Sequence, residues 1–480
     1  MIDISTKIHD RFTLEFKVGF VTGKGREPDD FSLAMWLFVP GGLDITPSTY
    51  SKDMFYSDVK SNIRLITPAF PLGDLAAGGV PLAKLRESAR AVQSGNGSME
   101  DFEYDVKMFC AIVKSSLREG LAALGPFTPD KVAGWEKYVD DAESVLDSFH
   151  SLRPASGGNW TDPEMERIFL RGDEFLGDIM SKYLMEFIRR VEGGLAPAVS
   201  QKAALLYRKI GRHDAEMGFP VIREDDPGHN RTYTHRFSAL KKYVEEVLYL
   251  RAPKKRDGVL LEQLYLSIAA GLAMLFATVV SFAFQKKFGS LTLPLFIALI
   301  VSYMLKDRIK ELMRYYLAHR VGGKFFDNKA RIIHKDTEFG WLKEGFDFVQ
   351  PEKVPRDVAG LRNRSHMTDI ETSTNTERVL MYRKSVHLDS AKLLENAEYS
   401  FSGINDIFRL NVTNFIKKAD NPVVLMNTMD EEGVLKTVPC DREYYINLVF
   451  RYSYDGTVEL KRFRIALSRD GIRAIEEVAR

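Results

Sequence analysis

Residues Leu264–Phe284 read LYLSIAAGLAMLFATVVSFAF and contain no charged side chain. At 1.5 Å per residue, a helix over this stretch is about 31 Å long, which matches the bilayer's hydrocarbon core of about 30 Å. A second apolar run, FGSLTLPLFIALIVSYML, covers Phe288–Leu305, and only a short turn with Lys286 and Lys287 separates the two runs. A helix in a soluble core usually carries a polar stripe, and neither run has one. The sequence therefore predicts an antiparallel transmembrane hairpin.

Small side chains recur every four positions on one face of each run. They are Ala269, Ala273, Ala277 and Ser281 in the first run, and Pro294, Ala298 and Ser302 in the second. Such stripes let two helix backbones approach closely in lipid. We expect the two stripes to face each other, and the same pattern would also suit a homo-oligomer.

Basic residues lie on both outer flanks of the hairpin. They are Arg251, Lys254, Lys255 and Arg256 before the first run, and Lys306, Arg308, Lys310, Arg314, Arg320 and Lys324 after the second. The turn carries only Lys286 and Lys287. Because loops rich in lysine and arginine remain in the cytoplasm, both termini are predicted to be cytoplasmic. The lipid bilayer and its anionic headgroups are thus the first expected partners.

The overall composition excludes several classes of protein. The 480 residues have a formal net charge of +1, so no global charge indicates a nucleic-acid partner. Two cysteines, Cys110 and Cys440, are too few for a disulfide framework or a thiolate zinc site, and they indicate a reducing compartment. Cys110 lies on an apolar helical face and is expected to be a buried, inert thiol. Together with the hairpin, these features predict a multi-pass protein of the bacterial inner membrane, with most of its mass in the cytoplasm.

Hydrophobic periodicity divides the chain into six regions. They are a β-rich region at 1–78, a cytoplasmic helical domain at 79–258, the transmembrane hairpin at 259–305, a basic juxtamembrane helix at 306–330, an irregular linker at 331–375, and a β-rich cytoplasmic domain at 376–480. The last region contains two alternating runs around Asp455-Gly456, a preferred pair for a tight hairpin turn. The predicted fold is an α+β membrane protein. Its N-terminal arm consists of β-strands and a helical bundle, and its C-terminal arm is β-rich. The two-helix transmembrane hairpin joins the two arms. Whether the N- and C-terminal strands share one sheet stays open.

One segment, REDDPGHNRTYTHR (Arg223–Arg236), combines several potential metal ligands. They are Asp225, Asp226, His229 and His235, and such a set could hold a divalent ion and activate water. The other interpretation is a solvated loop in which the carboxylates pair with Arg223 or Arg231, because the histidine spacing fits no ligand template. The remaining histidines occur singly and are interpreted as structural or surface residues. No catalytic, cofactor or metal site is therefore assigned.

No motif in the sequence defines a reaction. A nucleophile elbow, HExxH, Walker A, kinase signature and dinucleotide-binding glycine fingerprint are all absent. We therefore expect a membrane-bound scaffold, sensor or complex subunit that works through protein partners. The alternative is a membrane-tethered metal-dependent hydrolase that uses the Asp225/Asp226/His229/His235 loop. A transporter is disfavoured, because neither apolar run carries an ionisable residue that would mark a substrate path.

Overall fold

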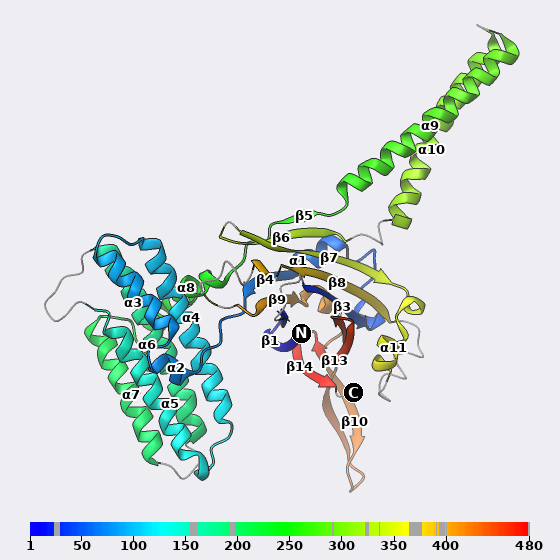
Figure 1. The fold of residues 1–480 in the computed structure, drawn as a ribbon. Coiled ribbons are helices and arrows are strands. Elements are labelled where there is room, and N and C mark those ends of the chain that lie inside the picture. The colour runs from blue at the N-terminus through cyan, green and yellow to red at the C-terminus, as the bar shows by residue number, and fades with distance from the viewer. Residues whose placement is uncertain are drawn as a thin grey trace. The chain divides into compact units, whose positions relative to one another are not determined.

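The computed structural model describes residues 1–23, 29–153, 162–191, 197–289, 292–321, 326–335, 337–363, 377–389, 391–392, 399 and 401–478 (Figure 1). Helices make up 50% of the structure and strands 30%, which confirms the mixed helix and sheet class. The chain divides into two compact units. The sheet unit comprises Met1–Arg64, Leu250–Asn396 and Gly403–Arg480, and the helical unit comprises Leu65–Tyr249 and Ala397–Ser402.

The helical unit is a set of packed amphipathic helices, as the sequence predicts. Its helices are α2 (Leu72–Ala76), α3 (Val80–Gln93), α4 (Met99–Leu124), α5 (Val132–His150), α6 (Pro163–Val191), α7 (Pro197–Glu216) and α8 (Pro227–Glu245), with 3-10 turns at Pro129–Lys131 and Glu246–Leu248. Helix α4 contacts α3, α6 and α8, and α6 also contacts α7. Cys110 of α4 is buried, as expected, and its thiol donates a weak hydrogen bond to the carbonyl oxygen of Gly172 at 3.7 Å.

The sheet unit contains two larger sheets and a two-stranded ribbon. Its strands are β1 (Ile2–Asp10), β2 (Thr13–Val21), β3 (Asp29–Val39), β4 (Val59–Leu65), β5 (Lys254–Arg256), β6 (Asn328–His334), β7 (Thr337–Val349), β8 (Arg378–Leu388), β9 (Gly403–Asn411), β10 (Val423–Met429), β11 (Leu435–Asp441), β12 (Tyr444–Tyr454), β13 (Thr457–Ser468) and β14 (Gly471–Val478). The strand order is β14-β13-β12-β3-β8-β7-β6-β5 in the larger sheet and β1-β2-β9-β4 in the smaller one, and β10 pairs with β11. Short helices α1 (Lys52–Asp58), α11 (Arg356–Arg362) and α14 (Thr413–Ile416), with 3-10 turns at Gly41–Leu43 and Pro351–Lys353, connect the strands.

The N- and C-terminal strands lie in the same sheets, which answers the question that the sequence leaves open. Strand β3 lies between β12 and β8, so that Trp36 is opposite both Val449 and Met381. Strand β2 pairs with β1 and β9. The two predicted arms therefore contribute strands to the same sheets. The chain builds one sheet unit, into which the helical unit is inserted after β4 and a helical hairpin is inserted between β5 and β6.

The predicted turn at Asp455-Gly456 is confirmed. It joins β12 to β13, and both residues have positive φ, 48° for Asp455 and 73° for Gly456. Positive φ at both central positions is the requirement of a type I′ turn, whose twist matches that of the two strands.

The predicted irregular linker at 331–375 is instead largely strand where the structure describes it. Strand β7 pairs with both β6 and β8 inside the larger sheet. The sequence pattern of β7 is weak because two glycines and three acidic residues have low strand propensity. One of these glycines, Gly340, is required, since a Cβ there would lie 2.3 Å from the carbonyl oxygen of His387. The predicted basic helix at 306–330 is described as helix up to Val321, and its last three positions belong instead to β6. Residues 364–376 of the predicted linker lie outside the described residues.

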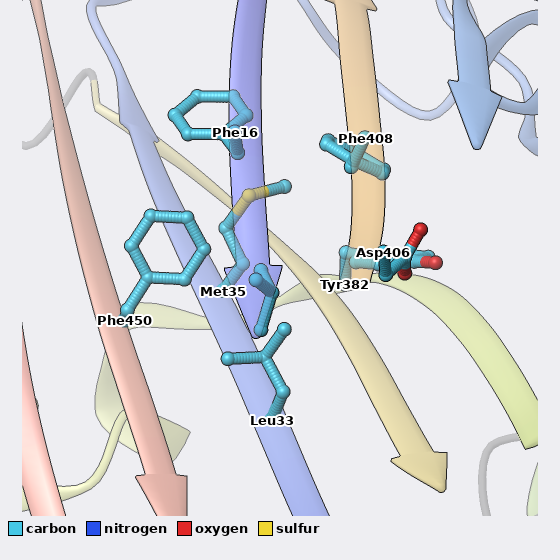
Figure 2. A pocket seen from close by; sticks show the side chains of 8 residues that line it. Phe16, Leu33, Met35, Tyr382, Asp406, Phe408 and Phe450 are labelled. Carbon is cyan, nitrogen blue, oxygen red and sulfur yellow. The ribbon is translucent and has the colours of Figure 1, made fainter. Parts of the chain in front are cut away.

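The two larger sheets pack against each other through aromatic side chains. Phe16 of the smaller sheet contacts Phe450 of the larger one in an edge-to-face arrangement, with ring centroids 5.5 Å apart. Figure 2 shows a small void beside this contact, lined by Phe16, Val18, Leu33, Met35, Tyr382, Asp406, Phe408 and Phe450. Its volume of about 10 Å³ is at the lower limit for one water molecule, so it is not a ligand pocket.

A buried network of charges lies at the Asp406 side of this void. Lys384 of β8 and Asp406 of β9 are each 3% exposed and form an ion pair, and Asp406 also accepts a hydrogen bond from Ser61 Oγ at 2.6 Å. Glu344 of β7 is fully buried and accepts a hydrogen bond from the Tyr382 hydroxyl at 2.9 Å. Burial alone would raise the pKa of Glu344, but the charges of Lys384 and Lys254 outweigh it and lower the pKa. The ionised network therefore connects strands of both sheets.

Candidate functional site

The hairpin inserted between β5 and β6 consists of α9 (Val259–Phe288) and α10 (Leu293–Val321), which pack against each other. The small residues buried in this contact are Ala269, Ala273, Ala298 and Ser302. Ser302 Oγ donates a hydrogen bond across the pair to the carbonyl oxygen of Ala277, at 3.4 Å. These contacts confirm that the two stripes face each other, although Ala277 and Ser281 are only half-buried and Pro294 is exposed. Since the stripes are occupied within one chain, a homo-oligomer would have to use other surfaces.

The outward faces of the hairpin are apolar and exposed. The exposed large side chains between Leu264 and Leu305 are Leu264, Ile268, Leu272, Met274, Leu275, Phe276, Val279, Phe282, Phe284 and Phe288 on α9, and Leu293, Phe296, Ile297, Leu299, Ile300, Val301, Tyr303, Met304 and Leu305 on α10. Within the described residues, one helix is long and apolar enough to cross a membrane, by length and composition: Gln263–Phe288, with a mean hydropathy of 2.1 and 11% of its window buried. Helix α10 continues past Leu305 into charged residues. Soluble proteins rarely expose an apolar surface of this extent, and exposed patches of this kind are typical of surfaces that contact a membrane or another protein.

The Asp225–His235 segment is not gathered into a metal site. Asp226 is the N-cap of α8, and its carboxylate accepts a hydrogen bond from the backbone N–H of His229 at 2.9 Å. Asp225 and His235 are exposed to solvent. Among the described residues, the one group of three potential ligands whose atoms lie close together is elsewhere. The segment thus forms the start of α8. The four residues that the alternative hydrolase hypothesis requires are not brought together as metal ligands.

That group is His150, Asp173 and His213 in the helical unit, one residue from each of three helices. The Nε2 atom of His150, at the end of α5, lies 2.7 Å from Asp173 Oδ1, and the Nε2 atom of His213 of α7 lies 2.9 Å from Asp173 Oδ2. The two imidazole rings lie close together, with centroids 4.4 Å apart. Asp173 is 1% exposed, whereas each histidine side chain is 22% exposed. A buried carboxylate is thus held between two imidazoles that solvent can reach.

The pKa of Asp173 reflects these contacts. Burial would raise the pKa, because a charged carboxylate loses its hydration in the interior. The hydrogen bonds and charges of His150 and His213 outweigh burial and lower the pKa below its ordinary value. Asp173 is therefore a carboxylate, and not a carboxylic acid, at neutral pH.

Further carboxylates surround this cluster. Glu174 is buried and forms a bidentate ion pair with Arg236 of α8, with an Nη2–Oε2 distance of 2.6 Å. Asp178 accepts a hydrogen bond from the Tyr233 hydroxyl at 2.8 Å. Burial, together with the neighbouring carboxylates Glu174 and Asp214, raises the pKa of Asp178 to about 7. Asp173, Glu174 and Asp178 therefore place three carboxyl groups within six residues of α6.

Asp214 follows His213 on α7 and packs closely on α6. A Cβ at Gly177 would lie 3.0 Å from Asp214 Oδ1, so the glycine permits this approach. Burial, with the nearby charges of Asp173 and Glu174, raises the pKa of Asp214 to about 6.

Asp178→Asn is expected to stabilise the helical unit, and to do so more at pH 8 than at pH 5. The pKa of Asp178 is about 7 in the folded protein and about 4 in an unfolded chain. The carboxyl group therefore favours folding most below pH 4, and this contribution is lost as the pH rises through 7. Asparagine keeps the acceptor for Tyr233 and removes the charge beside Glu174 and Asp214. The measurement is the Tm of both proteins between pH 5 and 8, by circular dichroism with a chelator present. A difference in Tm that does not grow with pH would contradict it.

The sequence predicts that His150 and His213 are isolated residues, and the structure corrects this. The two histidines are 23 and 40 residues from Asp173, and no local spacing relates the three. The three residues come together because of the register in which their helices pack. That register is a property of the tertiary structure, so no sequence pattern reveals the cluster.

No protein-family model, curated protein or solved structure matches the chain. Its function is therefore argued from the hairpin surface and the histidine–aspartate cluster themselves.

Proposed function

We propose that α9 and α10 cross a lipid bilayer as an antiparallel hairpin, and that the chain is a two-pass protein of the bacterial inner membrane. Both units then lie in the cytoplasm. The observation that carries this proposal is the exposure of the hairpin's apolar side chains, since only 11% of the apolar window of α9 is buried. In water, this surface would remain unfavourably hydrated, whereas lipid acyl chains would cover it.

The dimensions of the helices support this proposal. The 26 residues of Gln263–Phe288 extend about 39 Å, which exceeds a hydrocarbon core of about 30 Å and allows tilt. The apolar run of α10 ends at Tyr303–Lys306, where Lys306 Nζ lies 4.0 Å from the centroid of the Tyr303 ring. Tyrosine and lysine are typical residues of the membrane interface, where lysine extends its charge toward the headgroups.

The connection of the hairpin to the sheet supports the same-side topology. Strand β5 precedes α9 and pairs with β6, which follows α10, so that Lys254 lies opposite Ala330. Whichever side of the membrane holds the sheet unit must therefore also hold both ends of the hairpin. The excess of basic residues on both flanks favours the cytoplasm as that side. The same residues favour contact with anionic headgroups, at about 1 kcal/mol for each well-placed charge.

The biological role that we propose is that of a scaffold, sensor or complex subunit acting through protein contacts. Support comes from the ribbon of β10 and β11, which forms a sheet of its own. Its exposed apolar side chains include Leu425, Met426, Met429 and Leu435. An isolated two-stranded ribbon has marginal stability in water and would gain from contact with another surface.

The topology gives the test of this proposal. Protease added to spheroplasts is expected to leave the full-length chain intact, whereas protease added to inverted inner-membrane vesicles is expected to digest both units. Cys440 provides an internal reporter, because it is partly exposed on β11 whereas Cys110 is buried. A membrane-impermeant maleimide should label Cys440 in inverted vesicles and leave it unlabelled in spheroplasts.

A Lys287→Cys variant in the Cys440→Ser background is the matched control. Lys287 is exposed at the turn end of α9, so this cysteine should react with the maleimide in spheroplasts. Labelling of Cys440 from outside, or digestion of either unit in spheroplasts, would reverse the proposed orientation. Recovery of the wild-type chain in the soluble fraction would refute membrane insertion itself.

A further inference from the structure

We propose that His150, Asp173 and His213 bind one divalent transition-metal ion of the zinc class. Each residue offers one ligand atom, and these atoms lie within 4.8 Å of one another. The three ligands come from α5, α6 and α7, and metal sites in helical bundles are commonly built from side chains on facing helices. The inference is independent of the proposed membrane anchor, because all three residues belong to the helical unit.

The spacing of the ligand atoms is close to that of a metal complex. Both Nε2–carboxylate distances, 2.7 Å and 2.9 Å, are direct hydrogen bonds in the structure. Ligand atoms about 2.0–2.1 Å from a tetrahedral Zn²⁺ lie roughly 3.3 Å from one another. Binding therefore requires each Nε2 atom to move about half an ångström from the carboxylate oxygen that it now contacts. The imidazoles contact different oxygens of Asp173, so they must also turn toward one common ion, which side-chain rotation provides. The hydrogen-bonded cluster is the arrangement expected of such a site when protons replace the metal.

The ligand types select the class of metal. Two imidazoles and one carboxylate suit Zn²⁺ and the neighbouring first-row transition metals, whereas Ca²⁺ and Mg²⁺ prefer ligand sets made of oxygen. A set of three protein ligands is also typical of zinc sites that keep one coordination position for water. The histidine side chains are partly exposed, so an ion from solution can reach the ligand atoms.

The surrounding charge favours a cation. Of the carboxylates near the cluster, Glu174 is paired with Arg236. Asp178 accepts a hydrogen bond from the uncharged Tyr233 hydroxyl, and Asp214 lies against Gly177 of α6. Asp173 adds a further buried carboxylate, so negative charge is concentrated around the cluster. A divalent ion at the cluster would balance it at short range.

The helix that carries the central carboxylate is held in a fixed position. A Cβ at Gly172, next to Asp173, would lie 2.8 Å from Val106 Cγ1 of α4, so the two helices are in close contact there. Asp173 is therefore presented on a rigid element, and a metal ion would tie the ends of α5 and α7 to it. We expect metal binding to stabilise the helical unit, since the ion binds only the folded arrangement.

The test is a titration of the full-length, chelator-stripped protein in detergent with Zn²⁺ by isothermal titration calorimetry. We expect one equivalent of Zn²⁺ per chain and an increase in Tm on loading. The double variant His150→Gln/His213→Gln should weaken binding by at least about 100-fold, since even residues that only support a metal ligand contribute 10–100-fold to affinity. Glutamine can still donate a hydrogen bond to Asp173, which preserves the fold, and circular dichroism at the start of each titration checks this.

His235→Gln/Asp225→Asn is the matched control, because it removes the same types of ligand from exposed positions in and just before α8. This variant should bind Zn²⁺ within about twofold of the wild type, as expected for exposed side chains outside the ligand group. Co²⁺ provides a second readout, since its visible absorption bands should appear with the wild type and the control and disappear with the double histidine variant. Failure of the wild type to bind Zn²⁺ saturably would overturn the inference. Binding that persists in the double histidine variant, or is lost in the control, would overturn it as well.

Discussion

Leu275→Arg combined with Val279→Arg is expected to remove the protein from the carbonate-resistant membrane fraction. Both side chains lie on the outward face near the middle of α9, where they are 60% and 58% exposed. One arginine at the centre of a membrane helix costs about 3 kcal/mol of insertion free energy, so two cost roughly 6 kcal/mol. A change of this size shifts the balance between inserted and non-inserted hairpin by about 10⁴-fold. Immunoblotting of the carbonate-washed pellet and supernatant measures the result.

The control is the double variant Leu205→Arg/Ile222→Arg in the helical unit. Leu205 and Ile222 are as exposed as the two α9 residues, at 62% and 70%, but they lie outside the hairpin. An arginine on a surface that faces water costs little, so this variant should remain with the membrane. If the α9 variant also remains there, the outward face of the hairpin does not contact lipid.

Lys384→Met is expected to lower the free energy of unfolding of the sheet unit by about 3–5 kcal/mol. The substitution would leave the buried carboxylate of Asp406 with Ser61 as a hydrogen-bond donor but without its paired cation. Lys384 also lowers the pKa of buried Glu344, so a second carboxylate would lose a stabilising charge. The expected measurement is a lower midpoint of urea unfolding, with faster hydrogen–deuterium exchange in peptides from β8 and β9.

Two further variants test whether the loss of stability comes from leaving a buried charge unpaired or simply from losing an ion pair. Lys384→Met/Asp406→Asn removes both charges and keeps the acceptor for Ser61, so it should recover much of the lost stability. Arg451→Met breaks an exposed ion pair with Asp357, at 2.9 Å, and should cost less than about 1 kcal/mol. An equal loss of stability in Lys384→Met and Arg451→Met would show that burial does not determine the effect.

Several elements follow from local sequence, and the structure agrees with them. Alternating side chains predict the strands β12 and β13, and the Asp455-Gly456 pair predicts the turn between them. The uncharged run at Leu264–Phe284 predicts one long apolar helix, and its four-residue stripe of small side chains predicts which face is buried. These features depend on neighbours within a few residues, which the sequence displays directly.

Other features depend on segments that are distant along the chain. Strand β7 resembles a loop until β8 is placed beside it, because Gly340 is required by the close approach of His387 and not by its own neighbours. Lys384 of β8 and Asp406 of β9 are buried only because the two sheets enclose them. Within the helical unit, His150, Asp173 and His213 meet only because three helices pack in one register.

The sequence by itself therefore determined the apolar hairpin, the strand and helix types and the tight turn, since side-chain periodicity and turn chemistry act locally. Only the tertiary structure decided that the N- and C-terminal strands share their sheets and that the hairpin is inserted between paired strands. It also decided which charged and imidazole groups are buried together. The physical reason is that burial removes water from polar groups, and each must then find a partner on whichever element packs against it. That partner is set by three-dimensional packing, and sequence separation carries no information about it.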